Sequence, residues 1–421
     1  MNIIDELEWR ALTHQCTDLA SVKKELASPT VLYAGFDPTS DSLHVGSLLP
    51  LMMLRRFQLA GHRPIALVGG ATGMIGDPSG KSDERSLLSK EILQRNVSSI
   101  ETQMRRFLDF DGANAAIVLN NYEWMQPFSF LDFLRDVGKN FPVSVMLGKD
   151  SVKSRLERQD SGLSFTEFSY MLLQAYDFAY LAKHHNCMLQ IGGSDQWGNI
   201  TAGIDLGRRM LGQQLYGLTC PLLTTSDGRK MGKTEKGAVW LSADKTSPYE
   251  FYQYFVNVGD ADVLMVLRFL SDVTRTEYQE IEASMVAKPG EAQRRLAESI
   301  TRLVHGEAGL KSAVRASKTL FGAEIDSLSD NELNEIFADV PSSSIPMARL
   351  KEGLTLIDAL VAVSLASSKG EARRAIEGGS VYINNRKTVG IDRVLTTADL
   401  ASETVIVLRV GKKKYALLRF K

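Results

Sequence analysis

The first 225 residues alternate short apolar runs with helical stretches, and this alternation limits the possible folds more than any other feature of the chain. Short apolar runs are typical of strands that are buried on both faces. The apolar runs occupy residues 31–36, 64–69, 115–119 and 188–192. The helical stretches occupy residues 48–60, 90–109 and 165–183. Strands and helices that alternate in this way predict an α/β fold with a parallel sheet covered by helices.

The rest of the chain changes character near residue 247. Residues 247–321 have a purely helical pattern and predict a small helical domain. Residues 322–348 are acidic and rich in serine and end with two prolines, so we expect a tether between domains. The last segment, residues 349–421, is predicted to form two amphipathic helices followed by short strands at 380–383 and 404–410.

Composition narrows the class of protein. Hydrophobic residues make up 44% of the chain and charged residues 24%, which is typical of a soluble globular protein and excludes disordered, collagen-like and coiled-coil classes. No apolar run approaches the length of a membrane helix, and the N-terminus carries acids rather than a basic leader, so we expect a cytoplasmic location. Cys16, Cys187 and Cys220 lie far apart and predict neither a disulfide framework nor a zinc site.

Charge is distributed unevenly along the chain. Residues 349–421 contain 14 basic and 7 acidic residues, a net charge of +7, whereas the preceding residues have a net charge of −8. A basic module at the end of an acidic body favours contact with an anionic polymer, with a solvated basic face as the alternative.

The first predicted strand leads through a turn into the start of a helix at His44-Val45-Gly46-Ser47. Free backbone N–H groups at a helix start bind anions, and glycine leaves room for a flat ring on the backbone. This segment therefore favours a phosphate-bearing ligand. The alternative is that His44 only caps the helix.

Two glycine-rich segments partly resemble the phosphate loop of P-loop ATPases. Residues 69–78 contain four glycines, and Gly80-Lys81-Ser82 resembles the end of such a loop, but Ile75 replaces its first glycine. Residues 228–234 (GRKMGKT) fail the same comparison because Asp227 stands at that position. A P-loop ATPase is disfavoured. The second segment instead predicts a basic loop that closes over an anion, or a merely solvated basic loop.

Polar side chains on the third helical stretch predict a pocket. Tyr170, Gln174 and Asp177 share one helix face within an otherwise apolar sequence. Burial of a carboxylate and an amide is costly without partners, which favours a pocket wall. Tyr33 in the first strand adds a second phenol, and Asp195, which follows glycines after a strand, is well placed to hold ribose hydroxyls.

Six motifs, in order, give the chain a close resemblance to bacterial-type tyrosyl-tRNA synthetases over essentially its whole length. The motifs are YAGFDPTSDSLHVGS, GGATGMIGDPSGK, YMLLQAYD, QIGGSDQWGN, KMGKT and a C-terminal block that resembles an S4 RNA-binding domain. The first class I signature usually reads His-x-Gly-His, and here Ser47 replaces its second histidine. The second signature keeps both of its lysines, Lys230 and Lys233.

The resemblance implies a domain order and a set of partners. The implied domains are a Rossmann-like catalytic domain (1–225), the KMGKT loop and connection (226–246), a helical anticodon-side domain (247–321), a linker (322–348) and an S4-like RNA-binding domain (349–421). The implied partners are L-tyrosine, ATP with Mg²⁺, tRNA(Tyr) and a second copy of the chain in a homodimer. No tightly bound metal site is expected.

The resemblance also implies roles for individual residues. The residues implied to bind tyrosine are Tyr33, Asp77, Tyr170, Gln174, Asp177 and Gln190. Those implied to bind ATP are Gly35, Asp37, His44, Gly46, Ser47, Gly193, Asp195, Lys230 and Lys233. The implied catalytic residues are His44, Lys230, Lys233, Thr39 and Gln196. The expected RNA contacts are Lys369, Arg373, Arg374, Lys412 and Lys413.

This chemistry explains why the sequence contains no Ser/His/Asp arrangement. The substrate carboxylate is itself the nucleophile toward the α-phosphate of ATP, so positioning and charge stabilisation suffice. Two alternatives stay open at this point. The first is a non-catalytic RNA-binding protein on a synthetase scaffold, and the second is a synthetase for another aromatic amino acid, with tryptophan as the nearest candidate.

Overall fold

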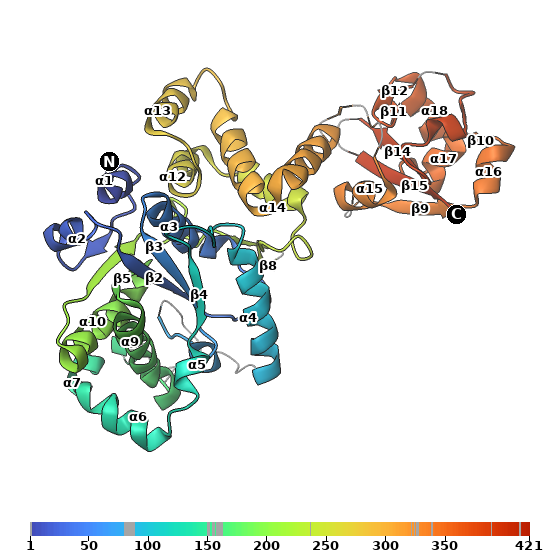
Figure 1. The fold of residues 1–421 in the computed structure, drawn as a ribbon. Helices are drawn as coiled ribbons and strands as arrows, with labels where there is room; N and C mark the ends of the chain where they lie inside the picture. The colour runs from blue at the N-terminus through green and yellow to red at the C-terminus, as the bar shows by residue number, and fades with distance from the viewer. Residues whose placement is uncertain are drawn as a thin grey trace. The chain divides into compact units, whose positions relative to one another are not determined.

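The computed structural model of the chain is drawn in Figure 1. It describes residues 2–79, 89–149, 152–153, 156, 163–235, 237–320, 322–323, 325, 328–337, 340–388, 390–411 and 414–421. The chain forms two compact units. The first consists of Met1–Thr246 with Tyr254–Val304, and the second consists of Ser247–Gln253 with His305–Lys421.

The first unit is built on a sheet of six strands among the described residues, in the order β1-β6-β5-β2-β3-β4. Neighbouring strands from β6 to β4 are parallel, and β1 adds an antiparallel edge. The strands are β1 (Gln15–Cys16), β2 (Val31–Phe36), β3 (Arg63–Val68), β4 (Ile117–Asn120), β5 (Cys187–Gly193) and β6 (Tyr216–Cys220). The predicted α/β fold with a parallel sheet is confirmed. The sequence did not predict β6, whose glycine and threonine interrupt the apolar pattern, or the two-residue β1.

Helices pack against the strands of this sheet. α3 packs against β2 and β3, while α9 packs against α10 and β5. The helices and short 3₁₀ turns of this part are α1 (Ile3–Trp9), α2 (Leu19–Glu25), η1 (Val45–Ser47), α3 (Leu48–Leu59), η2 (Thr72–Met74), α4 (Lys90–Met104), α5 (Tyr122–Met125), α6 (Phe130–Asp136), η3 (Gly138–Asn140), α7 (Val143–Leu147), α9 (Phe165–His185), η4 (Ser194–Gln196) and α10 (Trp197–Leu211).

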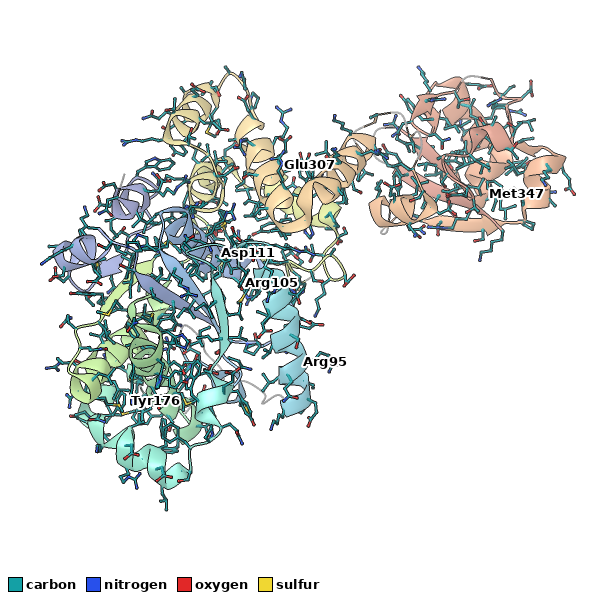
Figure 2. The ribbon with its side chains drawn as sticks, in the orientation of Figure 1. Arg95, Arg105, Asp111, Tyr176, Glu307 and Met347 are labelled. Atoms are coloured by element: carbon teal, nitrogen blue, oxygen red, sulfur yellow. The ribbon has the colours of Figure 1, made fainter. Side chains whose placement is uncertain are left out.

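Local sequence sets the limits of α9, the helix that carries the predicted pocket residues. Ser164 and Glu167 form a capping box at its start, and Asn186 ends it in the left-handed conformation. Phe178 on this helix is fully buried against the sheet beside Tyr33. Figure 2 shows the side chains and labels Tyr176 on the same helix. The Tyr176 ring is edge-on to the ring of Phe128, with 5.2 Å between the ring centroids.

The segment expected to be helical after residue 247 contains α11 (Pro248–Val256), α12 (Asp260–Leu270), α13 (Arg275–Ser284) and α14 (Glu291–Leu320). α14 ends at Leu320, within the segment expected to be helical. It contains a kink at Gly306, where φ is 72° and ψ is 179°. No helix in the described part of the chain is long and apolar enough to cross a membrane.

The second unit contains a mixed sheet, with five strands among the described residues in the order β12-β11-β14-β15-β9. Its strands are β9 (Ser342–Ile345), β11 (Val381–Ile383), β12 (Arg386–Lys387), β14 (Val405–Val410) and β15 (Lys414–Phe420), with a separate pair β10 (Leu354–Thr355) and β13 (Val394–Leu395). The helices are α15 (Asp330–Ile336), α16 (Met347–Glu352), α17 (Leu356–Ala362) and α18 (Lys369–Glu377), with the 3₁₀ turn η5 (Thr397–Asp399).

The expectation of a tether at residues 322–348 was wrong. This segment contains α15 and β9, and β9 pairs in parallel with β15. Leu333 and Phe337 of α15 are buried in a core that includes residues of β14 and β15. The error has a physical cause, because the serines of β9 join the sheet through their backbone and α15 buries only its few apolar residues. Most of the expected tether is therefore a packed part of the second unit.

Candidate active site

A cavity of about 300 Å³ lies at the carboxyl ends of the parallel strands β2, β3, β5 and β6. Ligands of open α/β sheets bind at this edge, because strand ends and the following loops meet there. The predicted site residues that line the cavity are Tyr33, Gly35, Asp37, Thr39, His44, Gly46, Ser47, Asp77, Tyr170, Gln174, Asp177, Gln190, Gly193, Asp195 and Gln196. The fold thus brings together residues that lie far apart in the sequence.

Two buried polar atoms in the cavity wall have no hydrogen-bond partner among the described residues. They are the hydroxyl of Tyr33 on β2 and the side-chain oxygen of Gln190 on β5. Burial raises the pKa of the Tyr33 hydroxyl well above its usual value, so this group stays neutral. Unpaired buried polar groups are costly, which means that this end of the cavity is suited to a ligand with a polar group of its own.

Asp177 on α9 is fully buried close to Tyr33 and is held by two donors. The Asn121 side-chain nitrogen lies 3.0 Å from one of its oxygens, and the indole nitrogen of Trp124 lies 2.8 Å from the other. Burial raises the pKa of Asp177 to about 7, while these two hydrogen bonds lower it and nearby Asp37 raises it. The carboxyl group therefore titrates near neutral pH.

Asn121 and Trp124 were not predicted from the sequence. Asn121 follows β4 directly, and a polar residue just beyond a strand end was the signal that could have identified it, whereas Trp124 lies on α5 and has no such signal. Asn121 also reaches Thr72, whose hydroxyl donates to Asp37 at 2.8 Å. Thr72 is a further residue of the cavity wall that the prediction did not include.

Tyr170 shares Asp37 with Thr72. The Tyr170 hydroxyl donates to the second Asp37 oxygen at 3.0 Å. Burial raises the pKa of the Tyr170 hydroxyl well above its usual value, with neighbouring carboxylates adding to the effect. The resemblance implied separate roles for Tyr170 and Asp37, whereas their side chains are directly hydrogen-bonded to each other.

A second hydrogen-bonded group surrounds Asp77. The Gln196 side-chain nitrogen donates to Asp77 at 2.7 Å, and the nitrogen of Gln174 donates to the Gln196 oxygen at 3.2 Å. Asn199, which was not predicted, donates to Gln196 at 3.2 Å and lies near Ser79. The Asp77 carboxylate provides a negative charge in this part of the cavity wall, which is suited to a cationic ligand group.

His44 in the first signature both caps a helix and lines the cavity, so the two interpretations of its sequence are compatible. The Nδ1 atom of His44 accepts a hydrogen bond of 3.0 Å from the Gly46 N–H and caps η1, and His44 also lines the cavity. A Cβ atom on Gly46 would lie 2.7 Å from the His44 ring, so only glycine fits. Ser47 lines the cavity and makes no side-chain capping bond to α3.

The second signature forms a loop next to the first. Its short strands β7 (Lys233–Thr234) and β8 (Gly237–Ala238) pair with each other. The side chains of Lys230 and Lys233 are exposed, and neither lines the cavity as the described residues define it. The structure therefore places the loop backbone against the first signature without bringing its two lysines into the cavity.

The predicted RNA contacts lie in the second unit. Lys369, Arg373 and Arg374 are exposed on α18, and Lys369 forms an ion pair of 2.7 Å with Asp358. Lys412 and Lys413, which were also predicted, lie outside the described residues.

Two family models match the chain and assign it to a class of proteins. Residues 24–322 match the family model described as tRNA synthetases class I (W and Y). Residues 332–418 match the model described as Tyrosine--tRNA ligase SYY-like C-terminal domain. The chain therefore belongs to the class I tRNA synthetases of the tryptophan and tyrosine family.

Similar proteins narrow the class further. The chain is 60% identical to a tyrosine–tRNA ligase of Rhodopirellula baltica, over 99% of this chain and 96% of that protein. It is 54% identical to the tyrosine–tRNA ligase of Roseiflexus castenholzii, over 99% of each. Within its class the chain has the function of a tyrosine–tRNA ligase.

Solved structures of tyrosyl- and tryptophanyl-tRNA synthetases are similar to this chain. A C-terminally truncated mitochondrial tyrosyl-tRNA synthetase of Aspergillus nidulans is 31% identical, with a TM-score of 0.68, over 76% of this chain and 94% of that one. A tryptophanyl-tRNA synthetase of Encephalitozoon cuniculi shares the fold at 12% identity, with a TM-score of 0.52, over 79% of this chain and 90% of that one.

Proposed function

We propose that Tyr33 and Asp177 bind the phenol of the substrate tyrosine. The observation that carries this assignment is the buried Tyr33 hydroxyl, which has no partner among the described residues and lies close to the Asp177 carboxyl. A phenol can accept a hydrogen bond from Tyr33 and donate one to Asp177. It would thereby give the Tyr33 hydroxyl a partner and Asp177 a third donor, whereas phenylalanine would leave the Tyr33 hydroxyl unpaired and offer Asp177 no donor.

The ammonium and carboxylate groups of tyrosine then lie toward the polar wall. Asp77 supplies the negative charge for the ammonium group, with Tyr170, Gln174 and Gln190 as further partners. Gln196, which donates to Asp77, is assigned to the reacting carboxylate. The carboxylate attacks the α-phosphate of ATP, an oxygen–phosphorus bond forms, and pyrophosphate leaves. The tyrosyl group then passes from the adenylate to a ribose hydroxyl at the 3' end of tRNA(Tyr).

ATP binds between the strand ends and the two signatures in this proposal. The residues assigned to it are Gly35, Asp37, Thr39, His44, Gly46, Ser47, Gly193 and Asp195. Lys230 and Lys233 approach the phosphates from the loop and stabilise the charge that develops on pyrophosphate. Mg²⁺ arrives with ATP and is held mainly by its phosphates.

The assignment is tested by amino-acid-dependent exchange of pyrophosphate into ATP. We expect exchange with tyrosine and strong discrimination against phenylalanine and tryptophan. Lys233→Ala tests the loop separately: we expect adenylate formation to slow by on the order of 10²-fold, as for the loss of one charge-stabilising donor, with little change in tyrosine affinity. Equal exchange with phenylalanine would contradict the pocket assignment, and a wild-type rate for Lys233→Ala would contradict the role of the loop.

We further propose that the second unit binds tRNA through α18. Lys369, Arg373 and Arg374 present three cations on one exposed helix, in the segment whose net charge is +7. Contacts of this kind weaken as salt rises, because bound phosphates release counterions. Arg373→Ala with Arg374→Ala should weaken tRNA binding and flatten its salt dependence, while adenylate formation stays unchanged.

We also propose that the enzyme is a homodimer through the face that carries α6, α7 and the start of α9. Phe130, Leu131, Val143 and Phe165 are exposed there, with 75% of Leu131 accessible. Large exposed apolar side chains gathered on neighbouring elements favour a protein interface. Leu131→Asp should therefore give monomers in sedimentation experiments. Leu59→Asp is the control, because Leu59 is equally exposed at 74% but lies at the end of α3.

A further inference from the structure

Gly232, the middle residue of the KMGKT loop, is hydrogen-bonded on both sides of its backbone. Its N–H donates to the hydroxyl of Tyr254 at 2.7 Å, and its carbonyl accepts from the Val239 N–H at 2.9 Å. Its φ of 85° lies in the left-handed region that favours glycine. Gly232 is thus a fixed point between Lys230 and Lys233, in addition to the hydrogen bond of 2.9 Å from the Met231 N–H to the Leu223 carbonyl and the pairing of β7 with β8.

This fixed point lies against the first signature. A Cβ atom on Gly232 would lie 2.9 Å from the Cβ atom of Val45 and 3.2 Å from the Gly46 nitrogen. The chain after the loop is also paired with this signature, because the Val45 N–H donates to the Val239 carbonyl at 2.9 Å. The backbone of Gly232 is therefore held next to residues that line the phosphate end of the proposed ATP site.

We propose that Tyr254 is a positioning residue for adenylate formation, whose hydroxyl fixes Gly232 so that the flanking lysines reach the ATP phosphates from a set point. Tyr254 lies near the end of α11, outside the residues that line the cavity, and is half-buried with its ring edge-on to Phe255 at 5.0 Å. Its hydroxyl is thereby anchored by a packed ring. The inference rests on the proposed role of the loop lysines.

Two alternatives for this hydroxyl predict other behaviour. If the hydrogen bond restrained the loop away from ATP, its removal would accelerate adenylate formation. If the hydroxyl served only the stability of α11, its removal would lower stability without a selective effect on ATP. A positioning role predicts a slower reaction and weaker use of ATP, because the backbone at Gly232 would lose one of its two hydrogen bonds and hold the adjacent Lys233 less precisely.

Tyr254→Phe removes only the hydroxyl and keeps the packed ring. We expect adenylate formation, measured by stopped flow on the full chain, to become about 10-fold slower, which corresponds to the loss of one partly buried hydrogen bond. The KM for ATP should rise and the KM for tyrosine should stay unchanged. Tyr278→Phe is the matched control, because its hydroxyl bonds to Glu282 on the exposed face of α13.

A double-mutant cycle separates positioning from general stability. If Tyr254 acts through Lys233, then Tyr254→Phe should cost little further rate in a Lys233→Ala chain. Full multiplication of the two effects, or a wild-type or faster rate for Tyr254→Phe alone, would overturn the inference. A normal Tyr254→Phe beside a slow Lys233→Ala would leave the proposed role of the loop intact and remove only Tyr254 from it. A normal Lys233→Ala would remove the basis for both.

Discussion

The indole N–H of Trp124 donates a hydrogen bond of 2.8 Å to the buried carboxyl group of Asp177. The two residues lie on different elements, α5 and α9, and the ring of Trp124 is stacked on Tyr180 of α9 with 4.3 Å between centroids. The stack fixes the direction of the indole N–H. Because burial favours the neutral form of Asp177, each donor that favours the charged form helps keep the carboxylate ready for the substrate phenol.

Trp124→Phe should weaken tyrosine binding without disturbing ATP. Phenylalanine can still stack on Tyr180, but the donor to Asp177 is lost. A hydrogen bond to a charged group contributes about 1.5–3 kcal/mol, so we expect the KM for tyrosine to rise by at least about 10-fold near neutral pH. Steady-state exchange kinetics measure the change. Trp9→Phe is the control, and an unchanged KM for tyrosine in Trp124→Phe would show that Asn121 alone holds the carboxylate.

Tyr33→Phe should make the enzyme more stable but less selective for tyrosine over phenylalanine. The Tyr33 hydroxyl is buried and has no partner among the described residues, which costs the folded state roughly 1–3 kcal/mol. Removing it should therefore raise the free energy of unfolding by about 1 kcal/mol while lowering the preference for tyrosine over phenylalanine about 10-fold. Denaturant titration and exchange kinetics with both amino acids test the two effects. Lower stability together with unchanged selectivity would contradict the assignment.

Tyrosine affinity should depend on pH through Asp177. Its pKa of about 7 is raised above the ordinary value, so the neutral form is increasingly populated below pH 7. The substrate phenol donates best to the charged form, which means that protonation opposes binding as the pH falls. Simple competition between a proton and tyrosine predicts about a 10-fold rise in the dissociation constant from pH 8 to pH 6. Equilibrium dialysis measures it.

The matched variant for this pH dependence is Asp177→Asn, which cannot titrate at this position. We expect its weaker tyrosine binding to be flat between pH 6 and pH 8. A flat profile in the unmodified enzyme would mean that Asn121 and Trp124 offset the effect of burial on the Asp177 pKa more completely than the geometry indicates.

Some residues of the cavity, such as Asp77 and Gln190, were expected only from the resemblance to a known family. Others follow a local pattern, because Asp195 comes shortly after a strand and Asp177 shares a helix face with Tyr170. Their partners could not be predicted in the same way. Trp124 lies 53 positions from Asp177 in the sequence, and only the packing of α5 near α9 brings them together.

The prediction of a tether at residues 322–348 was wrong because it relied on composition, whereas backbone pairing determines the structure of β9. The serines of β9 resemble a flexible tether in sequence, but their backbone extends the sheet beside β15. The exposure of Lys230 and Lys233 could not be predicted from the sequence either. A glycine-flanked basic loop has the same sequence whether it is open or closed.

The packing of α15 and β9 determines where the chain can be shortened. A chain that ends at residue 348 keeps α15 but loses β14 and β15, so Leu333, Ile336 and Phe337 lose the apolar partners that bury them. Each buried side chain of this size contributes about 1.5–3 kcal/mol, and we expect this form to aggregate. A chain that ends at residue 321 removes these side chains together with their partners. It should stay monodisperse in light scattering, retain adenylate formation and lose most transfer to tRNA. Equal behaviour of the two forms in solution would show that α15 does not depend on the C-terminal sheet, and loss of adenylate formation in the shorter form would show that the second unit supports the catalytic body.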